Sequence, residues 1–253
     1  MSLISSVTIP YYWEYLKLGL TLLEQQLPLP IQQMDDETLD NFYPENNLLL
    51  LNSLQKNINQ LEQSFFYIWG EKSCGKTHLL KALTHHFYKQ QRRAIYVPLN
   101  KACYFSPAVL ENLEYQQLVC LDDIHQVMKN AEWEIAIFDL FNRIKSSGNT
   151  LLVVSSEYSP NALDVDLPDL SSRLHWGEIY QLQGLNEEQK ILVLQTAAHL
   201  RGIELLEDTA QFLLKRLDRD MQNLLNTLAE LDKASLQAQR KLTIPFVKSI
   251  LNI

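Results

Sequence analysis

The feature that most constrains this chain is a segment that satisfies G-x-x-x-x-G-K-[ST] at every fixed position. It follows a short apolar run, Phe65–Trp69, and precedes a helical pattern, which is the setting of a phosphate-binding loop. Its glycines let backbone N–H groups wrap phosphates, and the helix N-terminus adds its dipole. Lys76 supplies a point charge for the β and γ phosphates, and the Thr77 hydroxyl can join a Mg²⁺ shell. The predicted nucleotide-binding residues are Gly70, Glu71, Lys72, Ser73, Cys74, Gly75, Lys76 and Thr77.

A second segment supplies carboxylates. The apolar run Leu118–Leu121 has the length of a buried strand and ends in Asp122 and Asp123. Alone, this pattern also fits a strand followed by a helix N-cap, but the preceding phosphate-binding loop favours a metal site. A strand that ends in an acid delivers it to a metal beside the phosphates, so we expect Asp122 to bind Mg²⁺ together with Thr77. The two segments predict a site for ADP or ATP with Mg²⁺.

Together the two segments resemble the Walker A and Walker B motifs of AAA+ proteins, and the resemblance implies further site residues. Asp123 stands where many AAA+ ATPases carry the glutamate that polarises the attacking water, and its shorter side chain predicts weak self-hydrolysis. Ser155 and Ser156 follow the apolar run Leu151–Val154, where AAA+ folds place a polar sensor of the γ phosphate, called sensor 1. A solvated loop fits the two serines equally well, so both interpretations stay open.

The distribution of apolar residues predicts an α/β fold. Short apolar runs alternate with helical patterns, which implies a parallel sheet of five strands flanked by helices, as expected for an AAA+ P-loop domain. The clearest helix covers Ala131–Lys145 and has Gly148 as its stop signal. The predicted strands are Phe65–Trp69, Ala94–Val97, Leu118–Leu121, Thr150–Val154 and Ile179–Leu182.

The region after Gly184 lacks strand signals and predicts three or four helices, the best of them with leucines at helical spacing from Met221 to Leu231. We expect this region to form a small all-helical lid domain. In its last helix Thr243 is a good capping residue and Pro245 is tolerated in the first turn. The predicted domains are an N-terminal tail over residues 1–34, in which Trp13–Glu24 could form a short helix, an AAA+ domain over 35–183 and the lid over 184–253.

The charge balance and the cysteines disfavour several classes of partner. The formal net charge is -8 and no run of Lys and Arg occurs, so direct DNA binding is not expected. Cys74, Cys103 and Cys120 lack C-x-x-C spacing, and the six histidines form no ligand pattern with them, which favours the reducing cytoplasm without structural zinc. Neither a basic leader nor an uninterrupted apolar span of membrane length is found, so secretion and a membrane partner are not expected.

Three segments resemble the bacterial replication initiator DnaA. Leu167–Gly177 is similar to its box VII, an S-R-[FL]-x-W-G run that presents an arginine finger. Leu121–Ile124 resembles its Walker B segment, and Asp218–Met221 resembles its sensor 2 arginine and the helix that follows. From about residue 35 onward the chain is thereby identified as a member of the DnaA/Hda family of AAA+ proteins. The resemblance implies that Arg173 is an arginine finger that acts in trans and that Arg219 reaches the nucleotide from the lid.

A peptide near the N-terminus resembles the Q-L-[SP]-L-P-[LI] motif by which proteins dock on the bacterial sliding clamp. Combined with an initiator-like AAA+ module, it is similar to the regulatory inactivation branch of the family. The initiator continues past its lid into a basic helix-turn-helix domain, whereas this sequence ends at Ile253 with an acidic balance, so a complete initiator is not expected. The predicted clamp-binding residues are Gln26, Leu27, Pro28, Leu29, Pro30 and Ile31.

Three functional hypotheses follow. The family resemblance implies a regulatory protein that holds ADP, binds the DNA-loaded sliding clamp and stimulates ATP hydrolysis by DnaA, so that over-initiation of DNA replication is prevented. A self-contained AAA+ ATPase such as a helicase loader would instead use its own Asp123. A nucleotide-stabilised adaptor would have no catalytic effect, and Arg173 would then be a surface residue paired with an acid such as Asp169.

Overall fold

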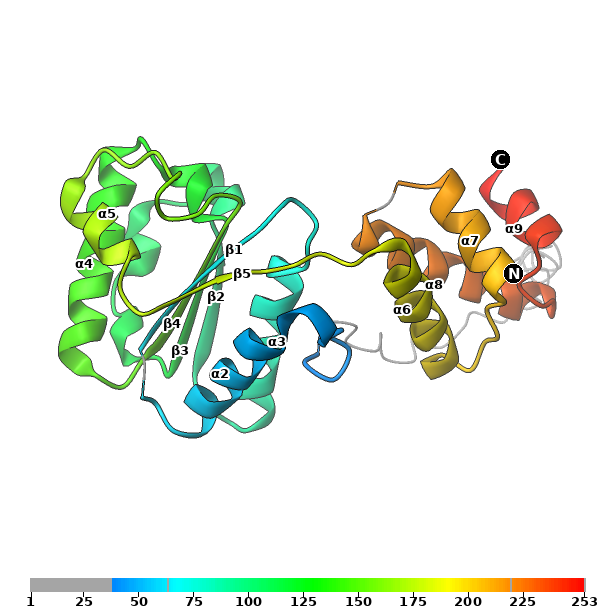
Figure 1. Cartoon of the computed structure of the whole chain (residues 1–253), viewed down its shortest axis with the longest axis horizontal. Coiled ribbons are helices and arrows are strands. Elements are labelled where there is room, and N and C mark those ends of the chain that lie inside the picture. Colours follow the sequence, from blue (N-terminus) through cyan, green and yellow to red (C-terminus); the bar gives the residue numbers. More distant parts are fainter. Residues whose placement is uncertain (1–37, 63, 219, 253) are drawn as a thin grey trace, which may run out of the picture. The chain divides into compact units, whose positions relative to one another are not determined.

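A parallel β-sheet of five strands organises the described part of the chain, which is residues 38–62, 64–218 and 220–252 of the computed structural model (Figure 1). The spatial order of the strands is β2-β3-β4-β1-β5, and all neighbours run parallel. The predicted α/β fold with five strands is thereby confirmed. The strands are β1 (Phe65–Trp69), β2 (Ala94–Pro98), β3 (Leu118–Asp122), β4 (Leu151–Ser156) and β5 (Glu178–Gln181).

Three predictions lie outside the described residues. They are the tail of residues 1–34 with its helix at Trp13–Glu24, the clamp-binding peptide Gln26–Ile31, and Arg219.

Successive side chains of the central strands point to opposite faces of the sheet, as the pleat of a β-strand requires. In β1, Phe65 and Tyr67 belong to the core on the first face, and Phe66 and Ile68 belong to the core on the second face. The strands β3 and β4 alternate in the same way. Both faces of these strands are therefore buried, which explains why their sequences are continuously apolar rather than alternating.

Helices cover both faces of the sheet. The helices α4 (Ala131–Ser147) and α5 (Pro168–Leu174) pack on the first face, and α2 (Leu48–Asn59) and α3 (Lys76–Lys89) pack on the second. Figure 1 shows the two pairs on opposite sides of the strands. Short 3-10 helices occupy the connections, namely Glu45–Asn47, Leu99–Tyr104, Pro107–Leu110, Leu113–Tyr115 and Ile124–Val127.

The predicted helix at Ala131–Lys145 is confirmed as α4, which ends two residues later at Ser147. The side chain of Asn130 caps its start by accepting hydrogen bonds from the N–H groups of Glu132 and Trp133. Its end is set by Gly148, whose φ of +68° lies in the left-handed region that favours glycine.

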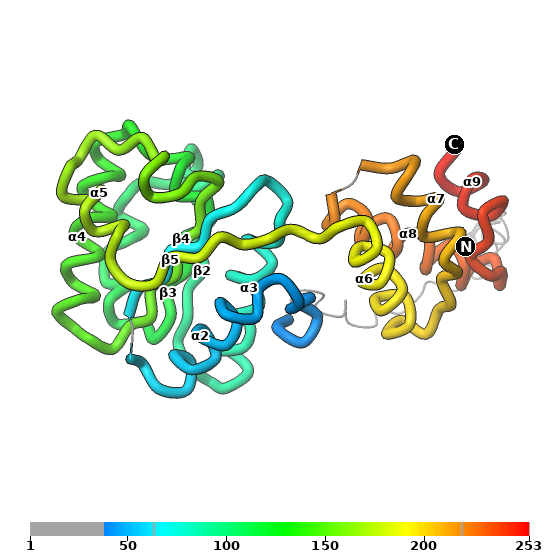
Figure 2. The backbone as a smooth tube through the Cα atoms, in the orientation of Figure 1, coloured from blue at the N-terminus to red at the C-terminus, as the bar shows by residue number. Residues whose placement is uncertain are grey.

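After β5 the described chain forms helices only (Figure 2). These helices enclose a core of their own. Leu194, Leu213, Leu228 and Phe246 lie at its centre, one from each helix. The predicted helical lid is confirmed. None of the described helices combines the length and the apolar character needed to cross a membrane. The lid helices are α6 (Glu187–Leu200), α7 (Glu207–Arg216), α8 (Met221–Ala238) and α9 (Ile244–Leu251).

One open alternative is excluded, and two local expectations are wrong. Ser155 and Ser156 are fully buried and extend β4, because the strand continues in register with the end of β1, so a solvated loop is excluded. The strand β5 begins and ends one residue earlier than predicted. Thr243 stands at the N-cap position of α9, but its side chain makes no capping hydrogen bond.

Candidate nucleotide-binding site

The loop after β1 forms a tight turn at the start of α3. Gly75 has a φ of +107°, a conformation that side chains rarely allow. A Cβ atom on Gly70 would lie 2.6 Å from the carbonyl oxygen of Leu182, so the backbone of Leu182 excludes a side chain there. Lys76 is 5% exposed, and its ammonium donates to the carbonyl oxygens of Gly70 and Glu71, both at 2.8 Å. The cation is thereby held against the loop at the start of α3, where helix N-terminal amides favour phosphate.

Asp122, at the carboxyl end of β3, is fully buried and joins three elements of the site. Its carboxylate accepts hydrogen bonds from the hydroxyls of Thr77 at 2.7 Å, Tyr96 at 2.7 Å and Ser155. These donors lie on α3, β2 and β4, so the two predicted motifs meet at one point. Thr77 and Asp122 place a hydroxyl beside a carboxylate, which are oxygen ligands that suit Mg²⁺ next to phosphates.

Asp123 follows directly and has a left-handed backbone conformation with a φ of +60°. Its N–H donates to the Ser155 hydroxyl at 2.9 Å, and its carboxylate accepts from the Asn100 amide at 2.9 Å. Burial, and after it the charge of Asp122, raises the pKa of the Asp123 carboxyl above its usual range. A raised pKa suits a group that accepts a proton near neutral pH. The Asp123 side chain is, however, already held by Asn100.

Arg173 lies in the last turn of α5, beside two aromatic side chains. Its guanidinium carbon is 3.9 Å from the centre of the Trp176 ring and 5.6 Å from that of Phe138. Its buried Nε has no hydrogen-bond partner among the described residues. Within the described ranges no ion pair joins it to Asp169 or to another acid, so the surface ion pair with Asp169 is not found. Arg173 is stacked on an aromatic ring with its charge unpaired.

A buried glutamate fixes the segment that leads into α5. Glu134 is 1% exposed, and its carboxylate accepts hydrogen bonds from three backbone N–H groups. The donors are Lys129 at 2.9 Å, Asp166 at 3.1 Å and Leu167 at 2.7 Å. Leu167 is the N-cap residue of α5 and has no side chain that could cap the helix. The carboxylate of Glu134 on α4 therefore anchors the start of the helix that carries Arg173.

Arg173 and the phosphate-binding loop belong to opposite ends of the sheet. The strands β1 and β5 pair in parallel, with Phe66 opposite Glu178 and Trp69 opposite Gln181. The loop follows the carboxyl end of β1, whereas α5 precedes the amino end of β5. The paired segments alone span about 10 Å along the strands, at about 3.3 Å per residue.

Comparison with known sequences assigns the chain to a family. The bacterial DnaA ATPase domain matches residues 35–181, which is more than half of the chain. The chain belongs to the DnaA/Hda family of AAA+ proteins. The lid domain of Hda matches residues 187–251. A Haemophilus influenzae protein described as uncharacterized is 65% identical over 231 residues, which are 91% of this chain and 100% of that relative.

Solved structures show the same fold at low identity. Domain III of DnaA from Thermotoga maritima has a TM-score of 0.69 at 19% identity, over 86% of this chain and 96% of that one. AMPPCP-bound DnaA from Aquifex aeolicus has a TM-score of 0.64 at 20% identity, over 78% of this chain and 65% of that one. The RuvB Holliday junction branch migration motor of Thermotoga maritima has a TM-score of 0.63 at 15% identity, over 85% of this chain and 71% of that one.

In this member of the DnaA/Hda family, the structure brings Thr77, Asp122 and Ser155 together. Ser156 is set apart, because its hydroxyl accepts the N–H of Tyr158 at 3.1 Å. Cys74 lies beside Gly70 in the loop, and burial raises the pKa of its thiol.

Sequence reasoning missed three residues that hold the site, namely Tyr96, Asn100 and Glu134. A signal existed for Asn100, because a polar residue that closely follows a strand points toward the edge where ligands bind. The hydroxyl of Tyr96 gave a weaker signal of the same kind, since it lies in an otherwise apolar strand. Nothing local distinguishes Glu134 from the exposed acid Glu132 in the same helical turn.

Proposed function

We propose that the chain is a cytoplasmic regulatory protein that binds ADP in its own loop and attaches to the DNA-loaded sliding clamp. In this state it stimulates ATP hydrolysis by the replication initiator DnaA and so prevents over-initiation. The observation that carries the proposal is Arg173, a cation without an acidic partner among the described residues, held at the end of the sheet opposite the phosphate-binding loop. Family membership makes an AAA+ initiator the natural partner.

The position of Arg173 favours action on a partner's nucleotide rather than on the chain's own. A guanidinium neutralises charge that develops on a transferring phosphoryl group, and it must touch that group to do so. The sheet separates Arg173 from the chain's own phosphate-binding loop. Arginine suits the role because its charge is permanent and its planar fork matches phosphate oxygens. Stacking on Trp176 restricts the side chain before the partner arrives, which lowers the ordering cost.

The chain's own nucleotide would be held by residues that already meet in the structure. Lys76 and the amides of the loop would bind the phosphates, and Thr77 and Asp122 would hold Mg²⁺. A bound metal ion neutralises phosphate charge. The Ser155 hydroxyl would fix the orientation of the Asp122 carboxylate. We infer weak self-hydrolysis, because Asp123 is short and is engaged by Asn100. ADP is the expected resident nucleotide, and Arg219 would reach it from the lid.

The peptide Gln26–Ile31 would attach the protein to the clamp. Leu27, Leu29 and Ile31 would be its apolar anchors, each contributing roughly 1.5 to 3 kcal/mol before ordering costs. Replacing Gln26 and Leu27 together by alanine should abolish capture by immobilised clamp while ADP binding persists. Capture at the wild-type level would remove the peptide from the proposal.

A self-contained ATPase such as a helicase loader is the second candidate, and the raised pKa of Asp123 favours it. The two candidates differ in their dependence on partners. The test is hydrolysis of labelled ATP by DnaA, measured with and without this protein, the clamp and DNA. We expect rapid conversion of DnaA-bound ATP only when all components are present. Turnover of ATP by this protein alone, at a rate that DnaA and the clamp do not change, would establish the second candidate instead.

A further inference from the structure

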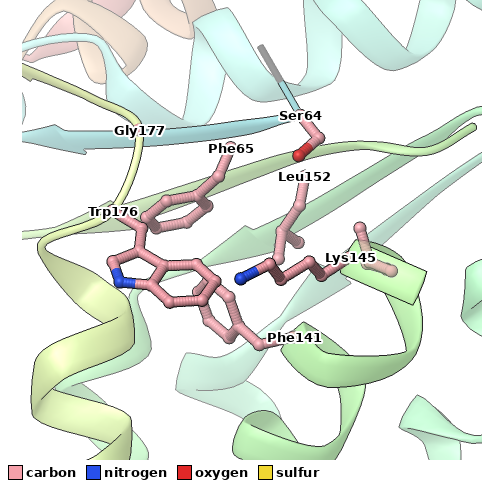
Figure 3. Close-up of a pocket in the computed structure, with 8 residues that line it drawn as sticks. Ser64, Phe65, Phe141, Lys145, Leu152, Trp176 and Gly177 are labelled. Atoms are coloured by element: carbon pink, nitrogen blue, oxygen red, sulfur yellow. The ribbon is translucent and has the colours of Figure 1, made fainter. Parts of the chain in front are cut away.

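A pocket of about 340 Å³ lies at the amino ends of β1 and β4, beside the residue on which Arg173 stacks (Figure 3). Its volume is at the lower end of the range for small-molecule pockets. Aromatic and aliphatic side chains form most of its walls, and Figure 3 shows the Lys145 side chain extending toward the Trp176 ring. The principal lining residues are Phe65, Phe141, Ile144, Lys145, Leu152 and Trp176.

Two cations share the Trp176 ring at this pocket. The Lys145 ammonium is 3.6 Å from the ring centre, and the Arg173 guanidinium carbon is 3.9 Å from it. Neither cation has a carboxylate partner among the residues that the structure describes. The ring attracts cations but does not neutralise them. The rim of the pocket therefore keeps a local positive charge on a chain whose net charge is -8.

The wall of the pocket at Gly177 is backbone and cannot be reshaped by side-chain rotation. A Cβ atom on Gly177 would lie 2.2 Å from the carbonyl oxygen of Phe65, and the φ of Gly177 is +77°. The backbone next to Trp176 thus lies close against the first residue of β1. Trp133 and Phe141 belong to the core of the same face, so the pocket opens from a firmly packed region rather than from a loop.

We propose that this pocket receives an apolar side chain of the partner AAA+ subunit, and that a carboxylate next to that side chain pairs with Lys145. The inference rests on the proposed function and names the contact that would align the partner with Arg173. Three observations support a protein partner, namely the apolar walls, the unpaired positive charge, and the sharing of Trp176 with the residue proposed to enter the partner's active site. Lys145 and the pocket serve binding, whereas Arg173 serves the chemical step.

The test separates binding from turnover. Lys145→Glu reverses the charge in the last turn of α4, and Lys89→Glu makes the same change at an exposed lysine in the last turn of α3. Stimulated hydrolysis is measured against the concentration of ATP-bound DnaA. We expect Lys145→Glu to raise the half-saturating concentration about tenfold or more, because the carboxylate proposed on the partner would then meet a like charge. Lys89→Glu should leave the half-saturating concentration unchanged.

A second variant fills the pocket without changing charge. Ser64→Phe places a ring at its lining and should raise the half-saturating concentration in the same way, with the unfolding temperature and ADP binding as checks on the fold. Wild-type half-saturation for Lys145→Glu overturns the inference, whether or not Ser64→Phe folds. If wild type gives no stimulation at all, the proposed function fails. Direct binding of ATP-bound DnaA, measured by sedimentation, then still tests whether the pocket binds the partner. Loss of this binding with Lys145→Glu supports the inference. Unchanged binding, or binding only to a second copy of this chain, refutes it.

Discussion

The two ends of the sheet differ in whether their charged groups are hydrogen-bonded within the chain. At the carboxyl end, the Asp122 carboxylate accepts from three hydroxyls and the Lys76 ammonium donates to two carbonyls, so each charge is stabilised within the chain. At the amino end, Arg173 and Lys145 lie over the Trp176 ring, and neither pairs with a carboxylate of the described residues. A site for the chain's own ligand needs preorganised groups, whereas a site for another protein can leave its charge to be paired on contact.

The largest effect should come from the amino end. Arg173→Ala should lower the maximal rate of stimulated DnaA hydrolysis by about 10³ to 10⁵, the range typical of arginine fingers. Binding of ADP should persist, because Arg173 lies at the opposite end of the sheet from the phosphate-binding loop, and clamp binding should persist because it is assigned to the peptide Gln26–Ile31. Arg173→Lys keeps the charge but loses the planar fork, so most of the defect should remain. If Arg173→Ala stimulates DnaA hydrolysis at the wild-type maximal rate, the proposed trans mechanism is refuted. The functional difference between the two ends of the sheet is then refuted too.

The next effect belongs to the carboxyl end. ADP at a hundredfold excess over its dissociation constant should stabilise wild type by about 2.7 kcal/mol. Lys76→Ala should lose most of this stabilisation, because the buried cation that faces the phosphates is gone. Lys72→Ala is the matched control, since Lys72 would contribute only its backbone N–H to the loop and its side chain is exposed. Thermal unfolding with and without ADP measures both variants, and equal ADP stabilisation of wild type and Lys76→Ala would refute the site.

A smaller effect should link α4 to Arg173. Glu134→Gln keeps the shape of the side chain but replaces one of its two acceptor oxygens with an amide NH₂ group. The three backbone N–H donors then share a single acceptor oxygen, so the start of α5 should loosen. We expect stimulated turnover to fall about tenfold, as small displacements of catalytic groups commonly cause. ADP binding should stay normal.

The control variant is Glu132→Gln, an exposed acid on the same helix. In an Arg173→Ala background, Glu134→Gln should cause no further loss of turnover, because its effect passes through Arg173. A further loss in that background, or an ADP-binding defect, would mean that Glu134 supports the fold in general rather than the finger.

The smallest effect is a change of stability with pH. Because the pKa of Asp123 is raised in the folded protein, ionising it costs stability, and the cost is absent below the ordinary value of 3.8 and complete above the raised pKa. Asp123→Asn should therefore unfold at a higher temperature than wild type at neutral pH, with the difference vanishing near pH 3. Asp40→Asn, at an exposed aspartate, is the control. A difference that persists at pH 3 would exclude ionisation as its cause.

The local sequence was enough to predict the position of the glycine loop, of Asp122 and Asp123, and of all five strands, because each depends on residues close together in the chain. Gly75 is needed for its backbone conformation, and Asp122 ends an apolar strand. Contacts between distant segments could not be predicted in this way. Glu134 binds the N–H of Leu167, 33 residues further on, and Tyr96 meets Asp122, 26 residues further on. The stacking of Arg173 on Trp176 is local, but its unpaired charge emerges only from the whole fold.

The position of Gly177 has a consequence for how this surface can vary in evolution. Gly177 is exposed, and exposed positions usually accept most amino acids at little cost in stability. Here even a methyl group would collide with the Phe65 carbonyl, and the backbone conformation is itself strained for any other residue. In a saturation-mutagenesis library this site should behave like an interior one, with nearly every allele depleted. A map of mutational tolerance based on exposure alone would therefore mark position 177 at the rim of the pocket as variable, although the backbone geometry allows only glycine there.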